Sequence, residues 1–369
     1  MIDKNKLTIG IEEEYMICNS SSYELENIAD KIMPQIDENL KDRYSFELIL
    51  SEIESNTSIC SSVKEAVEEV SRLRTYINKL CNNLNCSIGL SGTHPTSKPQ
   101  QQQFVNNESY NWVKDQLHYY ALRNLTFSQH VHIGVPNKKY FIPILNSLRR
   151  WIAPLLSIST NSPFFEGFQT GMLSSRTFQF GSFPRTNIPD YIDDYNSFIE
   201  IYNKYKKMKS ILYPRHIWWK IRPHIDFGTI EFRVCDAQRN LKNVSLIAAL
   251  SQALVYQSIL DYENKNLHQK FNLDLLNDGL WKAARFDFNG SLYDEPTNKM
   301  LKMKEMIKIM QDYCSESLAL YNNEFVHSYL ENILDYGPES NKQLEVYNDG
   351  GFEALKKFLV DNVSYTIGE

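Results

Sequence analysis

The chain has 369 residues, of which 42% are hydrophobic and 12% aromatic, so it can bury a sizeable core and intrinsic disorder is excluded. Its 39 basic and 45 acidic residues are interspersed and give a net charge of −6, and no basic block favours a nucleic acid or an anionic membrane surface as a partner. The six cysteines form no C-x-x-C pair, which is typical of a reduced, intracellular protein.

The apolar pattern also bears on localisation. No apolar leader precedes the first strand-like stretch, which starts near Ile9, as expected of a cytoplasmic protein. The longest uncharged apolar run, residues 244–260, carries serines and glutamines throughout, and this predicts a buried helix and not a membrane span. We therefore expect no membrane partner.

In chain order, strand-like and helix-like segments alternate. A strand is predicted at residues 9–17, and a capping box at Ser62 and Glu65 opens a helix whose apolar residues keep helical spacing up to Leu84. Further strands are predicted at residues 48–54, 87–92, 126–135 and 218–235. Further helices are predicted at residues 111–122, 141–159, 191–210 and 243–262.

The remaining segments complete the prediction of fold class. Residues 162–189 are rich in Gly, Pro, Ser and Phe and are predicted to be irregular, and such stretches in compact proteins are often functional. Helices dominate the C-terminal part, residues 298–369. We find no internal repeat and no dividing linker, so we predict one α+β domain over residues 1–369 with an antiparallel sheet flanked by helices.

Side chains alternate across a strand with a period of two, and this assigns faces to the first strand. Ile9 and Ile11 fall on one face, and Glu12 and Glu14 fall on the other. Glu13 falls on the apolar face, so we expect it to meet a buried arginine or the edge of the strand.

The same division recurs in three other segments. His130 and His132 alternate with aliphatic residues, and Glu231 and Arg233 alternate with Ile230, Phe232 and Val234. Glu52 and Glu54 are two residues apart and can also share a face. An antiparallel sheet with one solvated face produces a similar alternation, but such faces usually mix Lys, Thr, Ser and Gln. Here the polar positions are residue types that bind hard divalent cations.

A face that carries these residues predicts a magnesium site shared with phosphates. Magnesium prefers oxygen ligands, and clustered carboxylates are costly without cations because they repel one another. Glu12, Glu14, Glu54 and Glu231 can hold two or more ions, with an imidazole from His130. Arg233 beside them offers a planar cation to a transferring phosphoryl group. Since the sequence has no glycine-rich phosphate loop, metals and arginines must hold the phosphates.

At this point the residues match a known family. The matching motifs follow one another through about residues 8–290 and include Gly10-Ile11-Glu12-Glu13-Glu14-Tyr15, Glu47 with Glu52-Ile53-Glu54-Ser55-Asn56-Thr57, His130-Val131-His132-Ile133-Gly134, Thr170-Gly171-Met172-Leu173-Ser174-Ser175-Arg176, Gly228-Thr229-Ile230-Glu231-Phe232-Arg233 and Trp281-Lys282-Ala283-Ala284-Arg285-Phe286. On these motifs the chain resembles the type 2 glutamate–cysteine ligase family, the carboxylate–amine ligases of the glutamine-synthetase superfamily.

The resemblance implies a twisted antiparallel sheet that forms a funnel, into which ATP enters from one end and the other substrates from the opposite end. It implies that ATP phosphorylates a carboxylate, classically the side-chain carboxylate of glutamate, and that an amine then attacks the acyl phosphate. By this analogy the cofactors are ATP and Mg²⁺, with Mn²⁺ as an alternative, and the family favours a homodimer. The implied metal ligands are Glu12, Glu14, Glu54, His130 and Glu231, with His132 and Arg233 near the phosphates.

Several departures from the family pattern leave the amine substrate open. Glu52 stands where the family often has glutamine and adds a carboxylate to the metal region. Gln129, Ser109 and His224 stand where glycine, arginine and serine are usual. The acid, the amine and the pathway therefore stay unassigned.

Three further arginines are candidates for binding substrates or nucleotide. Arg176, in the irregular stretch, is expected to clamp a substrate carboxylate, because a guanidinium matches a carboxylate with two parallel hydrogen bonds. Arg222 is a weaker candidate for substrate and Arg285 for nucleotide. His94 is expected to fix its loop by hydrogen bonds. A related phosphotransferase, such as a guanidino kinase, and a non-catalytic ATP-binding protein are the alternative functions.

Overall fold

A seven-stranded antiparallel sheet forms the centre of the computed structural model, which describes residues 7–361 and 363. The strands run in the order β2-β3-β1-β5-β9-β8, and β4 pairs with the C-terminal end of β1. Their bounds are β1 Ile9–Asn19, β2 Tyr44–Phe46, β3 Glu52–Asn56, β4 Cys86–Gly89, β5 Gln129–Gly134, β8 Ile221–His224 and β9 Thr229–Phe232. The predicted α+β class with an antiparallel sheet is confirmed.

The register of the sheet aligns the predicted polar residues. Glu14 pairs with Glu54 across β1 and β3, and Glu12 pairs with His130 across β1 and β5. His132 pairs with Glu231, which in turn pairs with Arg222 on β8. Since residues directly opposite each other in an antiparallel pair project from the same face, these side chains share one face of the sheet.

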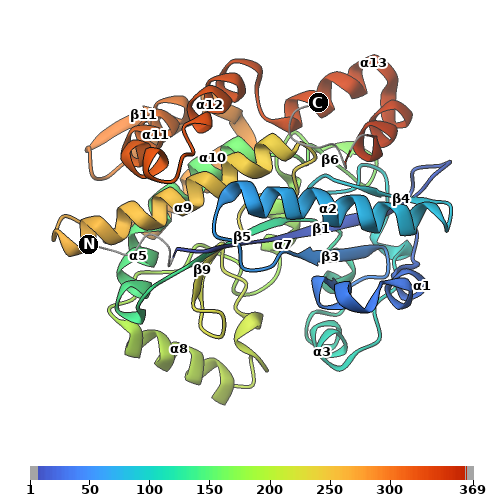
Figure 1. The fold of residues 1–369 in the computed structure, drawn as a ribbon, viewed down its shortest axis with the longest axis horizontal. Coiled ribbons are helices and arrows are strands. Elements are labelled where there is room, and N and C mark those ends of the chain that lie inside the picture. The colour runs from blue at the N-terminus through green and yellow to red at the C-terminus, as the bar shows by residue number, and fades with distance from the viewer. Residues whose placement is uncertain (1–6, 362, 364–369) are drawn as a thin grey trace.

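The other face of the sheet is apolar and is covered by two long helices, α2 Val63–Asn82 and α9 Leu241–Glu263 (Figure 1). Ile9, Ile11 and Val131 are buried there in the main core. Half of the predicted capping box of α2 is present, because the Ser62 side chain accepts a hydrogen bond of 3.2 Å from the Glu65 N–H, whereas the Glu65 carboxylate accepts from the Ser61 N–H. α9 is long and apolar enough to cross a membrane, but 78% of its most apolar window is buried inside the protein. It is the core helix that the sequence predicts.

The remaining elements surround this centre. α11 and α12 pack against α9 from outside, and α3 and α8 lie on the opposite side of the sheet (Figure 1). The other helices are α1 Ala29–Ile32, α3 Glu108–Leu117, α4 Tyr119–Leu122, α5 Phe141–Leu148, α6 Ile152–Ser159, α7 Ser175–Gly181, α8 Tyr195–Lys207, α10 Leu273–Phe286, α11 Met303–Leu320, α12 Phe325–Tyr336 and α13 Glu339–Val360. Two hairpins stand outside the main sheet, β6 Phe164–Phe165 with β7 Phe168–Gln169 and β10 Ser291–Asp294 with β11 Lys299–Lys302.

Several boundaries differ from the prediction. Residues 162–189 are not wholly irregular, since α7 begins after Ser174, whose hydroxyl caps the helix by accepting from the Thr177 N–H. The predicted strand 218–235 is a hairpin that turns at Gly228, where φ is +67°. The predicted helix 111–122 breaks at His118, where φ is +46°. In each case a local turn or cap overrides the apolar pattern.

Candidate functional site

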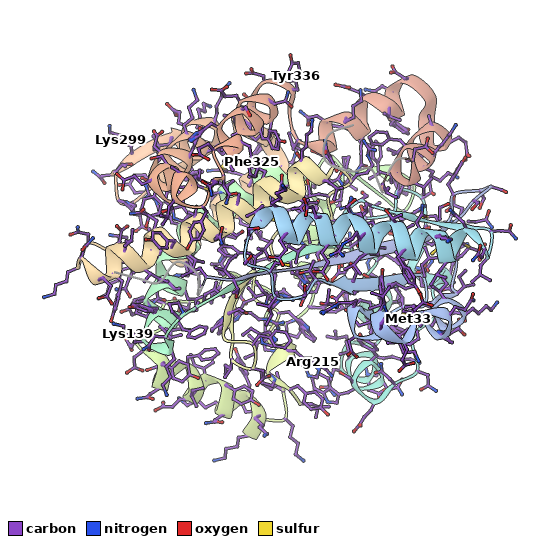
Figure 2. The ribbon with its side chains drawn as sticks, in the orientation of Figure 1. Met33, Lys139, Arg215, Lys299, Phe325 and Tyr336 are labelled. Atoms are coloured by element: carbon purple, nitrogen blue, oxygen red, sulfur yellow. The ribbon has the colours of Figure 1, made fainter. Side chains whose placement is uncertain are left out.

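The polar face of the sheet lines a cavity of about 1200 Å³. Arg215, labelled in Figure 2, borders this cavity on the side of the sheet opposite α2. Of the predicted site residues, those that line it are Glu12, Glu14, Glu52, Glu54, His130, His132, Arg176, Arg222 and Arg233. Ser109 and His224, two of the departures from the family pattern, line it as well. Glu231 is fully buried beneath them.

Seven acidic and histidine side chains form three overlapping groups of donor atoms. In each group the atoms that could bind a cation lie within 4.8 Å of one another. The groups are Glu12 with His132 and Glu231, Glu12 with Glu54 and His130, and Glu14 with Glu47 and Glu54. Because adjacent groups share Glu12 or Glu54, the donors form a continuous row along the sheet.

The carboxylates at one end of this row are electrostatically unfavourable by themselves. Burial, together with the neighbouring charge of Glu14, raises the pKa of Glu47 to about 8. Burial and the adjacent carboxylates also hold the pKa values of Glu52 and Glu54 well above their usual range. A divalent cation would remove this repulsion, since it favours the charged form of every carboxylate that it contacts.

At the centre of the row, Glu12 lies between the two histidines. His130 Nδ1 is 3.1 Å from one oxygen of Glu12, and His132 Nε2 is 3.0 Å from the other. The outer nitrogens of the rings are also held, His130 Nε2 by the Ser128 hydroxyl at 2.7 Å and His132 Nδ1 by the Thr229 hydroxyl at 2.9 Å. Such outer contacts fix the orientation of histidines that bind metals.

At the other end, Glu231 is held between two arginines. Arg222 donates to both oxygens of Glu231 from Nε and Nη2, and Arg233 donates from Nη1. Burial alone would raise the pKa of Glu231, but the two guanidinium groups hold it well below the usual range. Arg222 also donates to two backbone carbonyls through Nη1. Its donors are thus largely used within the protein, which argues against the substrate-binding role expected for it.

Arg176 reaches the cavity from α7. It is nearly fully buried, and its Nη1 and Nη2 donate to the backbone carbonyls of Val234 and Arg233 at 3.2 and 3.1 Å. Within the described part of the chain, its Nε has no hydrogen-bond partner. The prediction from an irregular segment therefore identified a residue that lies in the site, although its backbone is helical.

Two predicted site residues, Arg285 and Glu52, are not part of the donor groups, and Arg285 also lies outside the cavity. Arg285 is exposed at the end of α10, contacts the ring of Phe286 and does not line the cavity, because its helix packs on α6 away from the sheet. Glu52 lines the cavity but belongs to none of the three donor groups.

Two residues in the site were given no role from the sequence. Glu47 stands in a matching motif and supplies a donor atom, but it follows the last residue of β2, so strand alternation assigned it no face. Lys220 precedes β8 and is buried beside Arg176 and Arg233. The signal that could have found Lys220 was its spacing of two from Arg222.

The arrangement is suited to chemistry on phosphates. Carboxylate oxygens with one or two imidazoles suit Mg²⁺ and Mn²⁺, which usually share their coordination with substrate phosphates. The arginines that adjoin the carboxylates are the residues proteins use to bind phosphate and carboxylate groups. The cavity can therefore hold a polyanion and a carboxylate side by side.

Comparison with known proteins agrees with this chemistry. Residues 8–357 match the model of glutamate–cysteine ligase family 2. A relative from Herpetosiphon aurantiacus is 33% identical over 344 residues, covering 93% of this chain and 89% of its own length. One from Solibacter usitatus is 30% identical over 361 residues, covering 97% and 94%. Both carry the provisional name glutamate–cysteine ligase 2.

Solved structures share the fold at low sequence identity. Glutamate–cysteine ligase from Francisella tularensis, solved in complex with AMP, superposes with a TM-score of 0.73 at 13% identity and covers 98% of this chain and 89% of that one. A bifunctional glutathione synthetase from Pasteurella multocida superposes with a TM-score of 0.72 at 11% identity, covering 98% and 52%. The family match spans nearly the whole described chain and confirms the resemblance drawn from the motifs. The chain belongs to glutamate–cysteine ligase family 2, a family of ATP-dependent carboxylate–amine ligases.

Proposed function

We propose that the protein is a magnesium- and ATP-dependent ligase that activates a carboxylate of an amino acid, glutamate in the first instance, and joins it to an amine. The observation that carries this proposal is the row of three donor groups with Arg233 beside it. The names of the relatives favour glutamate as the acid and cysteine as one candidate amine.

The donor set fits divalent cations. Glu12, Glu14, Glu54, His130 and Glu231 would hold them, and the geometry adds Glu47 and His132 to this set. Bound Mg²⁺ or Mn²⁺ would neutralise charge on the phosphates of ATP and polarise the phosphoryl group that is transferred. Glu52 is near enough to the cluster to feel its charge, and we propose that it tunes the site without being a ligand.

The cationic side chains have separate tasks in this proposal. Arg233 lines the cavity, its buried Nε has no hydrogen-bond partner among the described residues, and Glu231 holds its Nη1. It is therefore placed to stabilise negative charge that develops during phosphoryl transfer. Arg222 positions Glu231 by two hydrogen bonds and does not need to touch a substrate. Arg176 binds a carboxylate of the acid substrate with its free donor.

A phosphotransferase that stops at a phosphorylated guanidino group is less well supported. The guanidino kinases considered as an alternative need a reactive cysteine, and no described residue that lines the cavity is a cysteine. All six cysteines are free and buried, which agrees with a reduced cytoplasmic environment.

We further propose a single catalytic domain that forms a homodimer, to be checked by light scattering at micromolar concentration.

One experiment tests the ligase proposal directly. Purified protein is incubated with ATP, Mg²⁺ and pairs of acids and amines, phosphate release is measured, and products are identified by mass. We expect release that requires both an acid and an amine and a product that contains a new amide. ATP hydrolysis that is independent of both, or a phosphorylated product without an amide, would contradict the proposal.

A further inference from the structure

Lys220 lies on the cavity face of the sheet although it falls outside the family motifs noted above. Its carbonyl accepts a hydrogen bond of 2.9 Å from the Arg233 N–H, which continues the β8–β9 ladder by one step beyond Ile221 and Phe232. Lys220 is two residues from Arg222, and Arg233 is two residues from Glu231. Alternation therefore directs the Lys220 side chain to the same face as Arg222, Glu231 and Arg233.

The ammonium group of Lys220 is buried over the ring of Phe180 and, among the described residues, has no hydrogen-bond or ion-pair partner. The residue is 2% exposed, and Nζ has no hydrogen-bond partner among the described residues. Nζ lies 5.3 Å from the ring centroid of Phe180, and the Arg176 guanidinium carbon lies 5.7 Å from the same centroid. Since Phe180 and Arg176 both line the cavity, Nζ stands directly behind its wall.

The charges around Lys220 do not balance. Burial, then Arg176 and Arg233, lower its pKa to about 7, and Asp236 opposes them. Asp236 already accepts hydrogen bonds from the Asn161 N–H and from the hydroxyls of Ser162 and Ser174. Arg233 pairs with Glu231, and Asp236 lies 4.0 Å from Arg176 Nη1 with its oxygens already in hydrogen bonds. Among the described residues, no carboxylate therefore forms a hydrogen bond with Lys220 Nζ. A buried charge is costly unless a counter-charge approaches it.

A second buried lysine, Lys356, forms ion pairs with carboxylates and serves as a comparison for Lys220. The Lys356 side chain on α13 is also nearly buried, but its Nζ is 2.9 Å from Glu24 and 2.7 Å from Glu353. Its pKa is raised in spite of burial, because of these two carboxylates. A buried lysine that does not line the cavity therefore has two carboxylate partners, whereas Lys220, behind the cavity wall, has no hydrogen-bond partner among the described residues.

We propose that Lys220 is a positioning and specificity-determining residue that, with Arg176, binds the non-reacting carboxylate of a dicarboxylic acid substrate. The other carboxylate of that acid would then lie toward the row of glutamates, where it is activated. This assignment rests on the proposed ligase function and names the class of acid: an acid with two carboxylates, such as glutamate, is preferred over an analogue with one.

The test compares Lys220→Met with Lys220→Arg and with the matched control Lys356→Met. Glutamate binding is measured by calorimetry in the presence of Mg²⁺ and ATP analogue, together with KM for glutamate and for ATP. The reference ligand is 4-aminobutyrate, which keeps the reacting carboxylate of glutamate but lacks the other one. Because a charge-assisted hydrogen bond is lost, Lys220→Met should raise Kd and KM for glutamate about ten- to a hundredfold and leave KM for ATP unchanged.

Three further readouts separate this role from a structural one. Lys220→Met should remove most of the preference for glutamate over 4-aminobutyrate, and Lys220→Arg should restore part of it. Lys220→Met should also raise the Tm, since it removes an unpaired buried charge, whereas Lys356→Met should lower the Tm and leave glutamate binding unchanged.

The outcomes are distinguishable from those of the ligase proposal. If wild-type protein binds glutamate and Lys220→Met does not, but neither forms an amide, the ligase proposal fails and the assignment of Lys220 stands. If Lys220→Met binds glutamate as tightly as wild type, or changes kcat or KM for ATP instead, the assignment is wrong. A loss of glutamate binding in Lys356→Met equal to that in Lys220→Met would also overturn it.

Discussion

Glutamate side chains on the two faces of the central sheet have different hydrogen-bond partners. Glu13 projects toward the helices and receives two hydrogen bonds from Arg74, at 2.7 and 2.6 Å. Glu54, which pairs with Glu14 next to Glu13, projects into the cavity on the opposite face. Its hydrogen-bond donors are the neutral side chains of Ser45 and Asn56. Within the described residues, no lysine or arginine forms an ion pair with Glu54, Glu47 or Glu52, and the nearby arginines pair with Glu231.

This difference separates stability from function. On the helix face, the remaining N–H groups of Arg74 donate to backbone carbonyls, so the buried pair is satisfied by the protein itself. On the cavity face, raised pKa values mark carboxylates whose counter-charge the protein does not supply. Strongly shifted groups in a cavity identify functional sites more often than structural ones. The protein supplies the counter-charge on one face, and in the proposed function cations and substrates supply it on the other.

The largest effect is expected from breaking the structural pair. Arg74→Met leaves Glu13 charged and buried without its partner, which should lower the free energy of unfolding by about 3–5 kcal/mol. Urea unfolding followed by circular dichroism measures this loss. The control is Arg74→Met combined with Glu13→Gln, which removes the orphaned charge and should recover part of the stability. If the single variant is as stable as wild type, the pair does not hold the helix face.

A nearly equal effect, on catalysis instead of stability, is expected on the cavity face. Arg233→Ala should lower kcat by about 10²–10³, because a donor to transition-state charge is lost, while Kd for ATP changes little. Arg233→Lys restores the charge but not the planar fork and should recover only part of the rate. Steady-state kinetics with a confirmed substrate pair, beside nucleotide titrations, gives both quantities. Equal losses of affinity and turnover would make Arg233 a ground-state binder.

A smaller effect concerns a buried group that the fold keeps neutral. His94 Nδ1 accepts from the Ser97 N–H at 3.1 Å, Nε2 contacts the Tyr23 carbonyl at 2.9 Å, and burial lowers its pKa to about 4. The predicted role in fixing its loop agrees with these contacts. Above pH 6.5 the imidazole is neutral in both states, and its contribution to stability is fully present. As the pH falls from about 6.5 to 4, the unfolded chain binds a proton that the folded chain excludes, and stability is lost.

His94→Asn, which keeps an acceptor near Nδ1, should remove this pH dependence. Between pH 7.5 and 4.5, wild type should lose about 2 kcal/mol more than the variant, by linkage to this one group. Urea unfolding at the two pH values provides the comparison. Identical losses in the two proteins would show that other groups, such as Glu24, control the acid sensitivity.

The smallest effect is expected at Glu52. Glu52→Gln removes a buried carboxyl group whose pKa burial and the neighbouring carboxylates raise, so it should increase the free energy of unfolding in metal-free buffer by about 1 kcal/mol or less. Thermal unfolding in EDTA tests this. A lower Tm would mean that Glu52 holds a structural contact instead of adding repulsion.

Much of the site could be predicted from the sequence because it lies on regular strands. Alternation alone placed Glu12, Glu14, His130 and Glu231 on one face, and it placed Glu13 on the face where a buried arginine meets it. The buried core helix α9 could also be predicted from the sequence, because polar residues within an apolar run distinguish a buried helix from a membrane span.

The rest depended on tertiary contacts that no local pattern encodes. Glu47 lies beyond the end of β2, where alternation no longer applies. Arg222 and Arg285 looked alike in sequence, yet one is buried against Glu231 and the other is exposed at the end of α10. The helix predicted at residues 141–159 is divided at Arg149–Trp151, and its two prolines, Pro143 and Pro154, fit in the first turns of α5 and α6.

The central claim is that divalent cations supply the charge missing from the cavity face, and Mn²⁺ binding tests it most directly. Free Mn²⁺ is followed by electron paramagnetic resonance during titration of wild type, Glu54→Gln and Glu52→Gln, with and without ATP. Glu54 belongs to two donor groups and Glu52 to none. We expect wild type and Glu52→Gln to bind Mn²⁺ alike, and Glu54→Gln to bind it at least about tenfold more weakly. No Mn²⁺ binding by wild type under either condition, or equal losses in the two variants, would contradict the account.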